Sequence, residues 1–236
     1  MYRGIAAILA AVLLAACATH SKDVIVSKPT IRRIAIIPAA NPTRYSFENA
    51  APPPPLAYPM QFWVNKFDSK SKAKIFNDSM HSPHSVLGDE FTEQVAAELR
   101  GYGFSVEILQ GIRRPLDNPD DVDYDKITTD ADAILHLWID EVGVYSSPLS
   151  AQYIPRVNLC GKLWAKGQED SLYNETLYYG VDAKAGKKWA IVPDPKYAYP
   201  NFEAVTSHID EIQTALSVGT LEISKKMTEQ IYGAIK

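Results

Sequence analysis

The pattern of hydrophobic and polar positions in the first half of this chain predicts two strands and a helix. Short apolar or alternating segments indicate the strands, and apolar residues repeated every four positions indicate the helix. The apolar run at Ile34–Ile37, closed by Pro38, is typical of a buried strand over 31–38 with both faces covered. Alternation predicts another strand over 104–109. Between them, a helix is predicted over 83–100, with Ser82 as N-cap and Pro83 at its first position. The apolar residues that recur every four positions in this helix are Leu87, Phe91, Val95 and Leu99.

The second half of the chain predicts an antiparallel sheet followed by a long helix. Alternating segments at 133–145, 154–166 and 172–180 are joined by short connections, as in a three-strand meander. An apolar stripe from Phe202 to Ile231 predicts one C-terminal helix, in which Gly219 is a candidate position for a bend. The predicted fold class is α/β (α+β): a β-α-β start, the meander, a mixed sheet of about five strands and the long helix.

Residues 38–84 interrupt the strand-to-helix connection and form the least regular part of the pattern. Four consecutive prolines, Pro52–Pro55, predict an extended rod, and a short helix is predicted over 56–67. Two interpretations of the aromatic residues here stay open: they cover the core of the domain, or they form an exposed arm that binds a partner. These residues are Tyr58, Phe62, Trp63 and Phe67.

The N-terminus is patterned for export. Arg3 precedes an uninterrupted apolar run, Ile5–Leu14, and the small residues Ala15 and Ala16 follow, as at a signal-peptidase site. The run is short for a permanent membrane span. Leu14-Ala15-Ala16-Cys17 resembles the lipobox of bacterial lipoproteins. That resemblance implies acylation of Cys17, for example with palmitate, and Ala18 then favours sorting to the outer membrane.

These features divide the chain into a lipoprotein signal peptide at 1–16, a polar tether at 17–30 and a single α/β domain at 31–236. Cleavage removes only Arg3 among the charged residues and leaves 23 basic and 28 acidic residues, a net charge of about −5. Such a balance does not favour nucleic acid. A domain of this length with 46% hydrophobic residues is expected to bury one core.

Candidate chemistry is sparse, and we expect no cofactor, no metal and no enzymatic activity. His81 and His84 are separated by Pro83 and lack a third ligand nearby in sequence. The Asp-rich stretch 117–125 lacks the glycine and the closing glutamate of a calcium loop. Cys160 is expected to be a small buried side chain, and His136 a hydrogen-bonded strand residue rather than a catalytic base.

Several short motifs resemble those of exported α/β domains. They are Arg33-Ile34-Ala35-Ile36-Ile37-Pro38, Glu98-Leu99-Arg100-Gly101-Tyr102-Gly103-Phe104-Ser105-Val106 and Asp130-Ala131-Asp132-Ala133-Ile134-Leu135. The pattern resembles the N-terminal domain of the Tol translocation protein, the curli secretion channel lipoprotein and the lipoprotein activators of penicillin-binding proteins. The chain lacks the membrane hairpins of the curli channel and the propeller of the Tol protein.

The resemblance implies a non-enzymatic scaffold on the outer membrane, facing the periplasm, that binds and assembles or activates other envelope proteins. Display on the cell surface stays open. An open sheet edge would support such a role, because unpaired edges recruit partner strands. An oligomeric, secretion-associated subunit is the alternative, and a cell-wall hydrolase using His136 or His84 is a weaker one.

Overall fold

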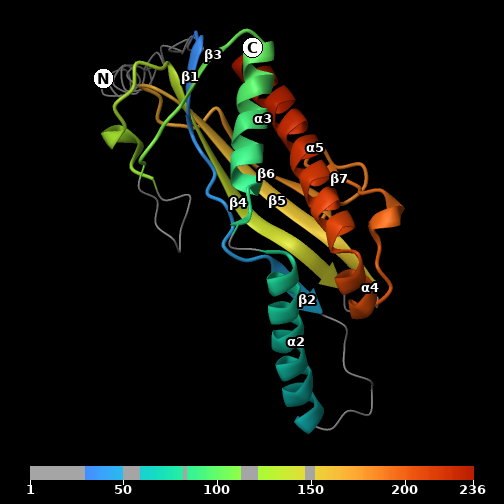
Figure 1. The fold of residues 1–236 in the computed structure, drawn as a ribbon. Coiled ribbons are helices and arrows are strands. Elements are labelled where there is room, and N and C mark those ends of the chain that lie inside the picture. Colours follow the sequence, from blue (N-terminus) through green and yellow to red (C-terminus); the bar gives the residue numbers. More distant parts are fainter. Residues whose placement is uncertain (1–29, 50–58, 82–83, 113–121, 147–151) are drawn as a thin grey trace, which may run out of the picture.

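The protein is built on one mixed β-sheet with helices packed on one face (Figure 1). The computed structural model describes residues 30–49, 59–81, 84–112, 122–146 and 152–236. The sheet order is β3-β1-β4-β5-β6-β7, with β2 also paired to β4. This confirms the predicted α+β fold. The short strands β2 and β7 come in addition to the five strands that were predicted. The strands are β1 Arg33–Ile37, β2 Ser46–Asn49, β3 Ser105–Ile108, β4 Ala133–Ser146, β5 Tyr153–Ala165, β6 Tyr173–Gly180 and β7 Ala190–Ile191.

The predicted β-α-β start is present. Strand β1 is parallel to both β3 and β4, and α3 (Leu87–Gly101) crosses between β1 and β3. Helix α3 begins later than the prediction of Pro83, because its N-cap position is Val86, which makes no side-chain capping bond. Asp89 and Glu90 in the first turn suit the helix dipole. Ser82 and Pro83 lie outside the described residues.

A bulge in β4 changes which side chains of the meander face the helices. Strands β4, β5 and β6 are antiparallel, as predicted, and the β4–β5 register shifts between Ile139 and Glu141. An extra residue reverses the alternation of a strand. Leu137 before the bulge and Val142 after it therefore both lie in the core cluster, although they differ in sequence parity. The prediction from simple alternation holds only up to the bulge.

The C-terminal stripe forms two helices rather than one. His208 separates helix α4 (Phe202–Ser207) from helix α5 (Ile209–Ile235). Helix α5 runs continuously through Gly219. Gly219 therefore does not interrupt the helix. Glycine is needed there because α5 approaches β6 closely: a Cβ atom would lie 2.5 Å from Cδ1 of Tyr179.

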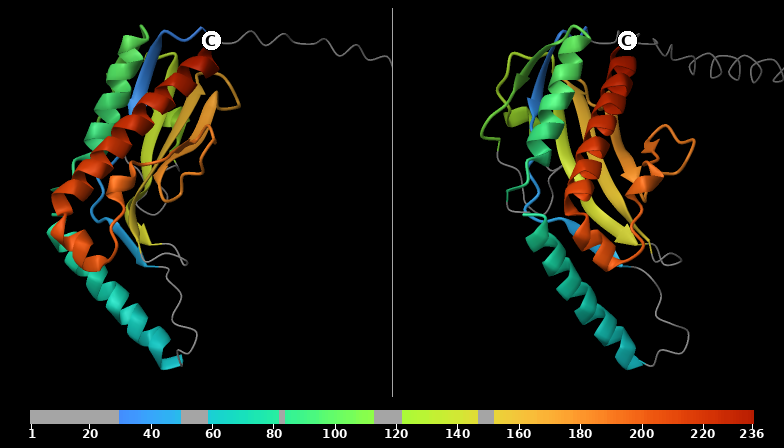
Figure 2. Two further views of the ribbon diagram at one scale, coloured as in Figure 1. Left: turned by 90° about the vertical axis from the view of Figure 1, so that its right-hand side faces the viewer. Right: turned by 45° about the vertical axis from the view of Figure 1, so that its right-hand side comes forward.

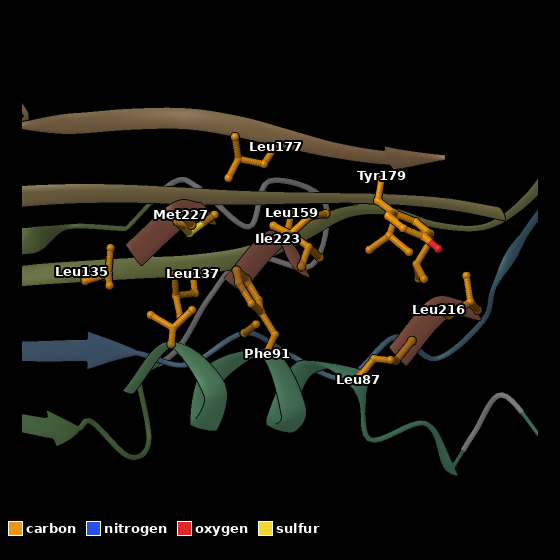
Figure 3. Close-up of a cluster of buried hydrophobic side chains, with 14 of the residues drawn as sticks. Leu87, Phe91, Leu135, Leu137, Leu159, Leu177, Tyr179, Leu216, Ile223 and Met227 are labelled. Atoms are coloured by element: carbon orange, nitrogen blue, oxygen red, sulfur yellow. The ribbon is translucent and has the colours of Figure 1, made fainter. Parts of the chain in front are cut away.

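The main core lies between the sheet and the helices α3 and α5, and Figure 2 shows both helices on the same side of the sheet. Leucine side chains of β4, β5 and β6 meet apolar side chains of α3 and α5 there (Figure 3). None of the described helices is both long and apolar enough to cross a membrane. The labelled members of the cluster are Leu87, Phe91, Leu135, Leu137, Leu159, Leu177, Tyr179, Leu216, Ile223 and Met227.

The opposite face of the sheet is partly covered too. Ile37, Ile134 and His136 are buried on it, where the short 3₁₀ helix η3 (Tyr124–Lys126) brings the Tyr124 ring to within 6.2 Å of the His136 ring. Both faces are therefore covered in this part of the sheet. A second 3₁₀ helix, η4 (Pro195–Tyr197), precedes α4.

Residues 38–84 contain regular structure. Strand β2 pairs with β4 through Ser46–Asn49, and α2 spans Pro59–Ser79. The helix predicted over 56–67 is therefore real but starts three residues later and continues twelve residues further. The tight β2–β4 contact depends on Gly143, where a Cβ atom would lie 1.9 Å from the Ser46 carbonyl oxygen. This connection is thus part of the sheet.

Candidate functional site

Helix α2 is fixed to the body of the protein at its C-terminal end. Phe76 is fully buried and packs against Phe47 of β2, with 5.6 Å between ring centroids. The Asn77 side chain exchanges two hydrogen bonds with the backbone of Tyr45: the Tyr45 N–H donates to Asn77 Oδ1 at 2.6 Å, and Asn77 Nδ2 donates to the Tyr45 carbonyl at 2.9 Å. Met80, also buried, completes this attachment.

The N-terminal half of α2 extends away from the sheet and from the other helices (Figures 1 and 2). Of the residues predicted to bind a partner, Tyr58 lies outside the described residues. Phe62, Trp63 and Phe67 fall within the projecting half, and their side chains lie outside the described part. The structure therefore places three of the four predicted residues on an arm and leaves their contacts as a prediction.

The exposed residues of α2 nearest the body include two lysines beside Ser71, Ile75 and Asp78. Lys70 and Lys74 are exposed, and Lys74 pairs with Asp78 at 2.6 Å one turn away. Lys72 lies over the Phe202 ring of α4, with 5.6 Å from Nζ to the ring centroid. An exposed ion pair of this kind contributes little to stability, about 0–1 kcal/mol. The Lys74–Asp78 pair therefore does little to fix the arm.

A second feature lies at the end of the sheet where β4, β5 and β6 approach β2, on the face opposite α5. Arg156 is only 13% exposed at its side chain and pairs with Asp182 at 2.8 Å, while its guanidinium lies 4.3 Å from the Tyr145 ring centroid. Glu48 and Glu141 lie 3.4 and 4.0 Å from the same guanidinium. The arginine is thus enclosed by carboxylates from three separate parts of the chain.

Several carboxylates surround this single arginine, and the pKa of a nearby carboxyl group is raised. Burial raises the pKa of Asp140, and the nearby Asp182 carboxylate adds to the rise against the opposing effect of Arg156. Asn158 is 5% exposed and donates from Nδ2 to Asp182 at 2.9 Å. The only local sign of this cluster is a charged residue, Arg156, inside an alternating strand.

His136 belongs to an aromatic cluster. It is fully buried, its Nδ1 lies 3.2 Å from the Tyr124 hydroxyl, and its ring lies 5.0 Å from the Trp138 ring. Lys162 lies over Tyr124, at 5.4 Å from the ring centroid. This confirms the expectation of a hydrogen-bonded strand histidine.

The remaining candidates have simple placements. Cys160 is buried, as expected, with Sγ 3.1 Å from the Thr176 hydroxyl. His81 and His84 are both exposed beside a hollow of about 250 Å³ that Tyr45 and Glu90 also line. Within the described residues, no group of three or more metal-ligating side chains converges. Cys17 lies outside the described residues, so its acylation stays a prediction.

Comparison with known proteins assigns no family to this chain and finds only distantly similar solved structures. No family model matches this sequence, and no curated protein matches it. A DUF330 protein from Xanthomonas campestris is 9% identical with a TM-score of 0.42, over 89% of each chain. Lipoprotein GNA1162 from Neisseria meningitidis is 12% identical with a TM-score of 0.30, over 65% of this chain and 87% of that one.

A presumed lipoprotein from Caulobacter crescentus is 14% identical with a TM-score of 0.32, over 62% of this chain and 81% of that one. All three TM-scores are below 0.5, too low for the function of any of these proteins to be transferred. The resemblance of the sequence to the Tol protein, the curli channel and the penicillin-binding protein activators stays a prediction.

Proposed function

We propose that this protein is a lipid-anchored scaffold of the bacterial envelope that binds other envelope proteins and assembles or activates them without chemistry of its own. The anchor is Cys17, which follows the apolar segment Ile5–Leu14 and the small residues Ala15 and Ala16. Each buried methylene of an acyl chain contributes about 0.8 kcal/mol, so several chains on one cysteine hold a domain stably at a membrane. We place the domain on the periplasmic side of the outer membrane.

The observation that carries the binding role is that the described contacts of α2 lie toward its C-terminal end. Phe76 and Asn77 fix its C-terminal end, while its N-terminal half projects beyond the sheet (Figure 1). Aromatic residues contribute strongly to protein interfaces, and four of them cluster in the sequence at and just before this half of the helix. We infer that Tyr58, Phe62, Trp63 and Phe67 contact the partner.

The experiment is site-specific photo-crosslinking in the native envelope. A photo-reactive residue replaces Trp63, and the matched control carries it at Glu229, an exposed position of α5. We expect protein adducts at position 63 and none of the same mass at position 229. Identical adducts at both positions, or none at position 63, would contradict the proposal.

A second arm of the experiment separates binding from folding. The triple variant Phe62→Ser, Trp63→Ser, Phe67→Ser is expected to keep the thermal unfolding transition of the parent, because the described anchoring contacts of α2 lie at Ala73, Phe76, Asn77 and Met80. Its crosslinks from a photo-reactive residue at position 66 should disappear. Loss of cooperative unfolding in this variant would show that the aromatics belong to the core.

A further inference from the structure

A stacked pair of tyrosines joins the C-terminal ends of α3 and α5. Tyr102 directly follows α3, and Tyr232 lies in the last turn of α5. Their ring centroids are 4.5 Å apart, with 18° between the ring planes. Phe104 meets the Tyr232 ring edge-on at 6.3 Å, and Lys236 Nζ lies 5.6 Å from its centroid. Tyr102 is 39% exposed, so the outer ring of this stack lies at the surface.

The tyrosine pair lies at the end of the domain where the described chain begins. Thr30 is the first described residue, and Arg33 of β1 pairs with Ser105 of β3, three residues after Tyr102. Figures 1 and 2 show the start of β1 and the ends of α3 and α5 at one end of the sheet, with α2 at the other. The tyrosine pair and the projecting arm are therefore at opposite ends of the domain.

The spacing between the predicted anchor and the domain bears on which end can reach the lipid. Thr30 is thirteen positions after Cys17. An extended chain spans at most about 3.6 Å per residue, so an acylated Cys17 would hold Thr30 within about 45 Å of the membrane. Strand β4, with 14 residues, is itself about 45 Å long. The anchor thus lets the tyrosine end reach the lipid, and the side chains exposed there decide whether it binds.

Tyr102 differs from the other large hydrophobic side chains that are exposed. Among the described residues these others are Ile75, Val86, Val192 and Leu221, all of them aliphatic. Tyrosine is enriched where proteins meet the membrane interface, because its ring is apolar and its hydroxyl bonds with water and headgroups. An exposed tyrosine at the end that follows the tether is therefore placed to contact lipid.

Two guanidinium groups accompany the tyrosine pair. Arg100 lies in the last turn of α3 and Arg32 just before β1, and both are exposed. Neither has an ion-pair partner among the described residues: Arg100 donates to the Val106 carbonyl at 3.4 Å, while it is Arg33 that pairs with Asp132. The ends of α3 and α5 each contribute only about half a negative charge, which two guanidinium groups exceed. This end therefore attracts anionic headgroups.

The carboxylates at this end belong to the sheet layer and not to the helix layer. Asp130 and Asp132 precede β4, and Glu169 and Asp170 lie in the connection from β5 to β6. Asp132 already accepts hydrogen bonds from two backbone N–H groups at the start of β1. The helix layer, which carries the tyrosine pair, is therefore the part of this end that suits an anionic surface.

We propose that Tyr102, Tyr232, Arg32 and Arg100 dock this end of the domain on an anionic phospholipid surface, so that α2 projects away from the membrane. The tyrosine rings lie at the interface, and the guanidinium groups bind lipid phosphates. The proposal rests on the proposed lipid anchor and adds to it an orientation of the scaffold. The position of the tether and the two unpaired guanidinium groups set the occupant.

The test is photo-crosslinking to lipid in the native envelope. A photo-reactive residue replaces Gly101, where an added Cβ meets nothing within 4 Å, and the matched control carries it at Ser207, exposed at the end of α4. Figure 1 shows α4 at the end opposite to the tyrosine pair. We expect at least fivefold more phospholipid adducts at position 101 by mass spectrometry. Equal yields, a larger yield at position 207, or protein adducts alone at position 101 would overturn the proposal.

Variants of Tyr102 test the aromatic contact. With the photo-reactive residue at position 101, Tyr102→Ser should lower the yield of lipid adducts at least threefold, whereas Tyr102→Trp keeps an interfacial aromatic ring and should preserve the yield. Val192→Ser removes another exposed hydrophobic side chain and should change nothing. Thermal unfolding of each variant identifies any loss of fold. An unchanged yield in a folded Tyr102→Ser would contradict the role of the tyrosine.

A vesicle experiment tests the charge and makes the surface independent of acylation. The full chain, produced without acylation, is coupled through Cys17 to a maleimide lipid, because Cys160 is buried. Vesicles containing phosphatidylglycerol should give at least threefold more adducts at position 101 than pure phosphatidylcholine, and Arg32→Gln with Arg100→Gln should remove the difference. Equal yields with both lipids in the parent would overturn the anionic assignment. Since this coupling replaces acylation, failure of the cellular anchor and failure of docking are separate outcomes.

Discussion

The side-chain amide of Asn77 and the backbone of Tyr45 form a reciprocal pair of hydrogen bonds, 2.6 and 2.9 Å long, between α2 and the start of β2. The same Nδ2 group also donates to the Ala73 carbonyl at 2.9 Å. Tyr45 is buried, and its hydroxyl donates to Ser85 at 2.9 Å. One side chain thus fixes the direction of the arm relative to the sheet.

Asn77→Asp is expected to loosen α2, because a carboxylate keeps the acceptor for the Tyr45 N–H but loses the donor to the Tyr45 carbonyl. Leaving a buried carbonyl unpaired costs about 1–3 kcal/mol in the free energy of unfolding. Urea unfolding measures this loss, and hydrogen exchange should rise in α2 and β2. Lys74→Gln, on the exposed side of α2, is the matched control and should change little. An effect of equal size in both variants would contradict the role of Asn77.

Two glycines of α5 are expected to respond in opposite directions to alanine. Gly219→Ala places a Cβ atom 2.5 Å from the Tyr179 ring, so we expect a loss of about 1–3 kcal/mol in the free energy of unfolding. At Gly233 an added Cβ meets nothing within 4 Å, so alanine should stabilise by up to about 1 kcal/mol through helix propensity. Thermal unfolding compares them, and a stabilising Gly219→Ala would show that α5 does not approach β6 as described.

Asp132 should make stability depend on pH. The backbone N–H groups of Arg32 and Arg33 each donate to Asp132 Oδ2 at 2.9 Å and lower the pKa of this carboxyl in the folded protein. A lowered folded pKa contributes stability above the unfolded value, about 3.9, and that stability is lost as the pH falls through the folded pKa.

Asp132→Asn should therefore reduce the free energy of unfolding at pH 7, and the difference from the parent should shrink as the pH drops below about 4. Urea unfolding at pH 7 and pH 3 checks this. Asp170→Asn, at an exposed position before β6, is the control. A difference that grows toward low pH would have the wrong sign for this mechanism.

Cys17→Ser is expected to release the protein from the membrane fraction, because it removes the sulfur that acylation requires. Fractionation of the envelope with antibody detection measures the distribution. A neutral change in the tether, Ser21→Ala, should leave the protein in the outer-membrane fraction. Persistence of Cys17→Ser in that fraction would remove the basis for the anchor.

The sequence by itself determined the local elements. The four-residue spacing of Leu87, Phe91, Val95 and Leu99 specifies a helix, and alternation specifies the meander, because these periods follow from backbone geometry alone. The export pattern around Cys17 is likewise local. The aromatic residues Tyr58, Phe62, Trp63 and Phe67 could also be identified as a cluster from the sequence.

The tertiary structure decided everything that depends on distance through space. The bulge at Asp140, the break at His208 and the contact of Gly219 with Tyr179 arise from packing between segments far apart in sequence. The carboxylates around Arg156 come from β2, β4 and the loop after β6, so no local pattern marks them. The partly open edge of β6, where β7 pairs only with Tyr178 and Tyr179, is visible only once strand order is known, because edge and centre strands share the same alternation.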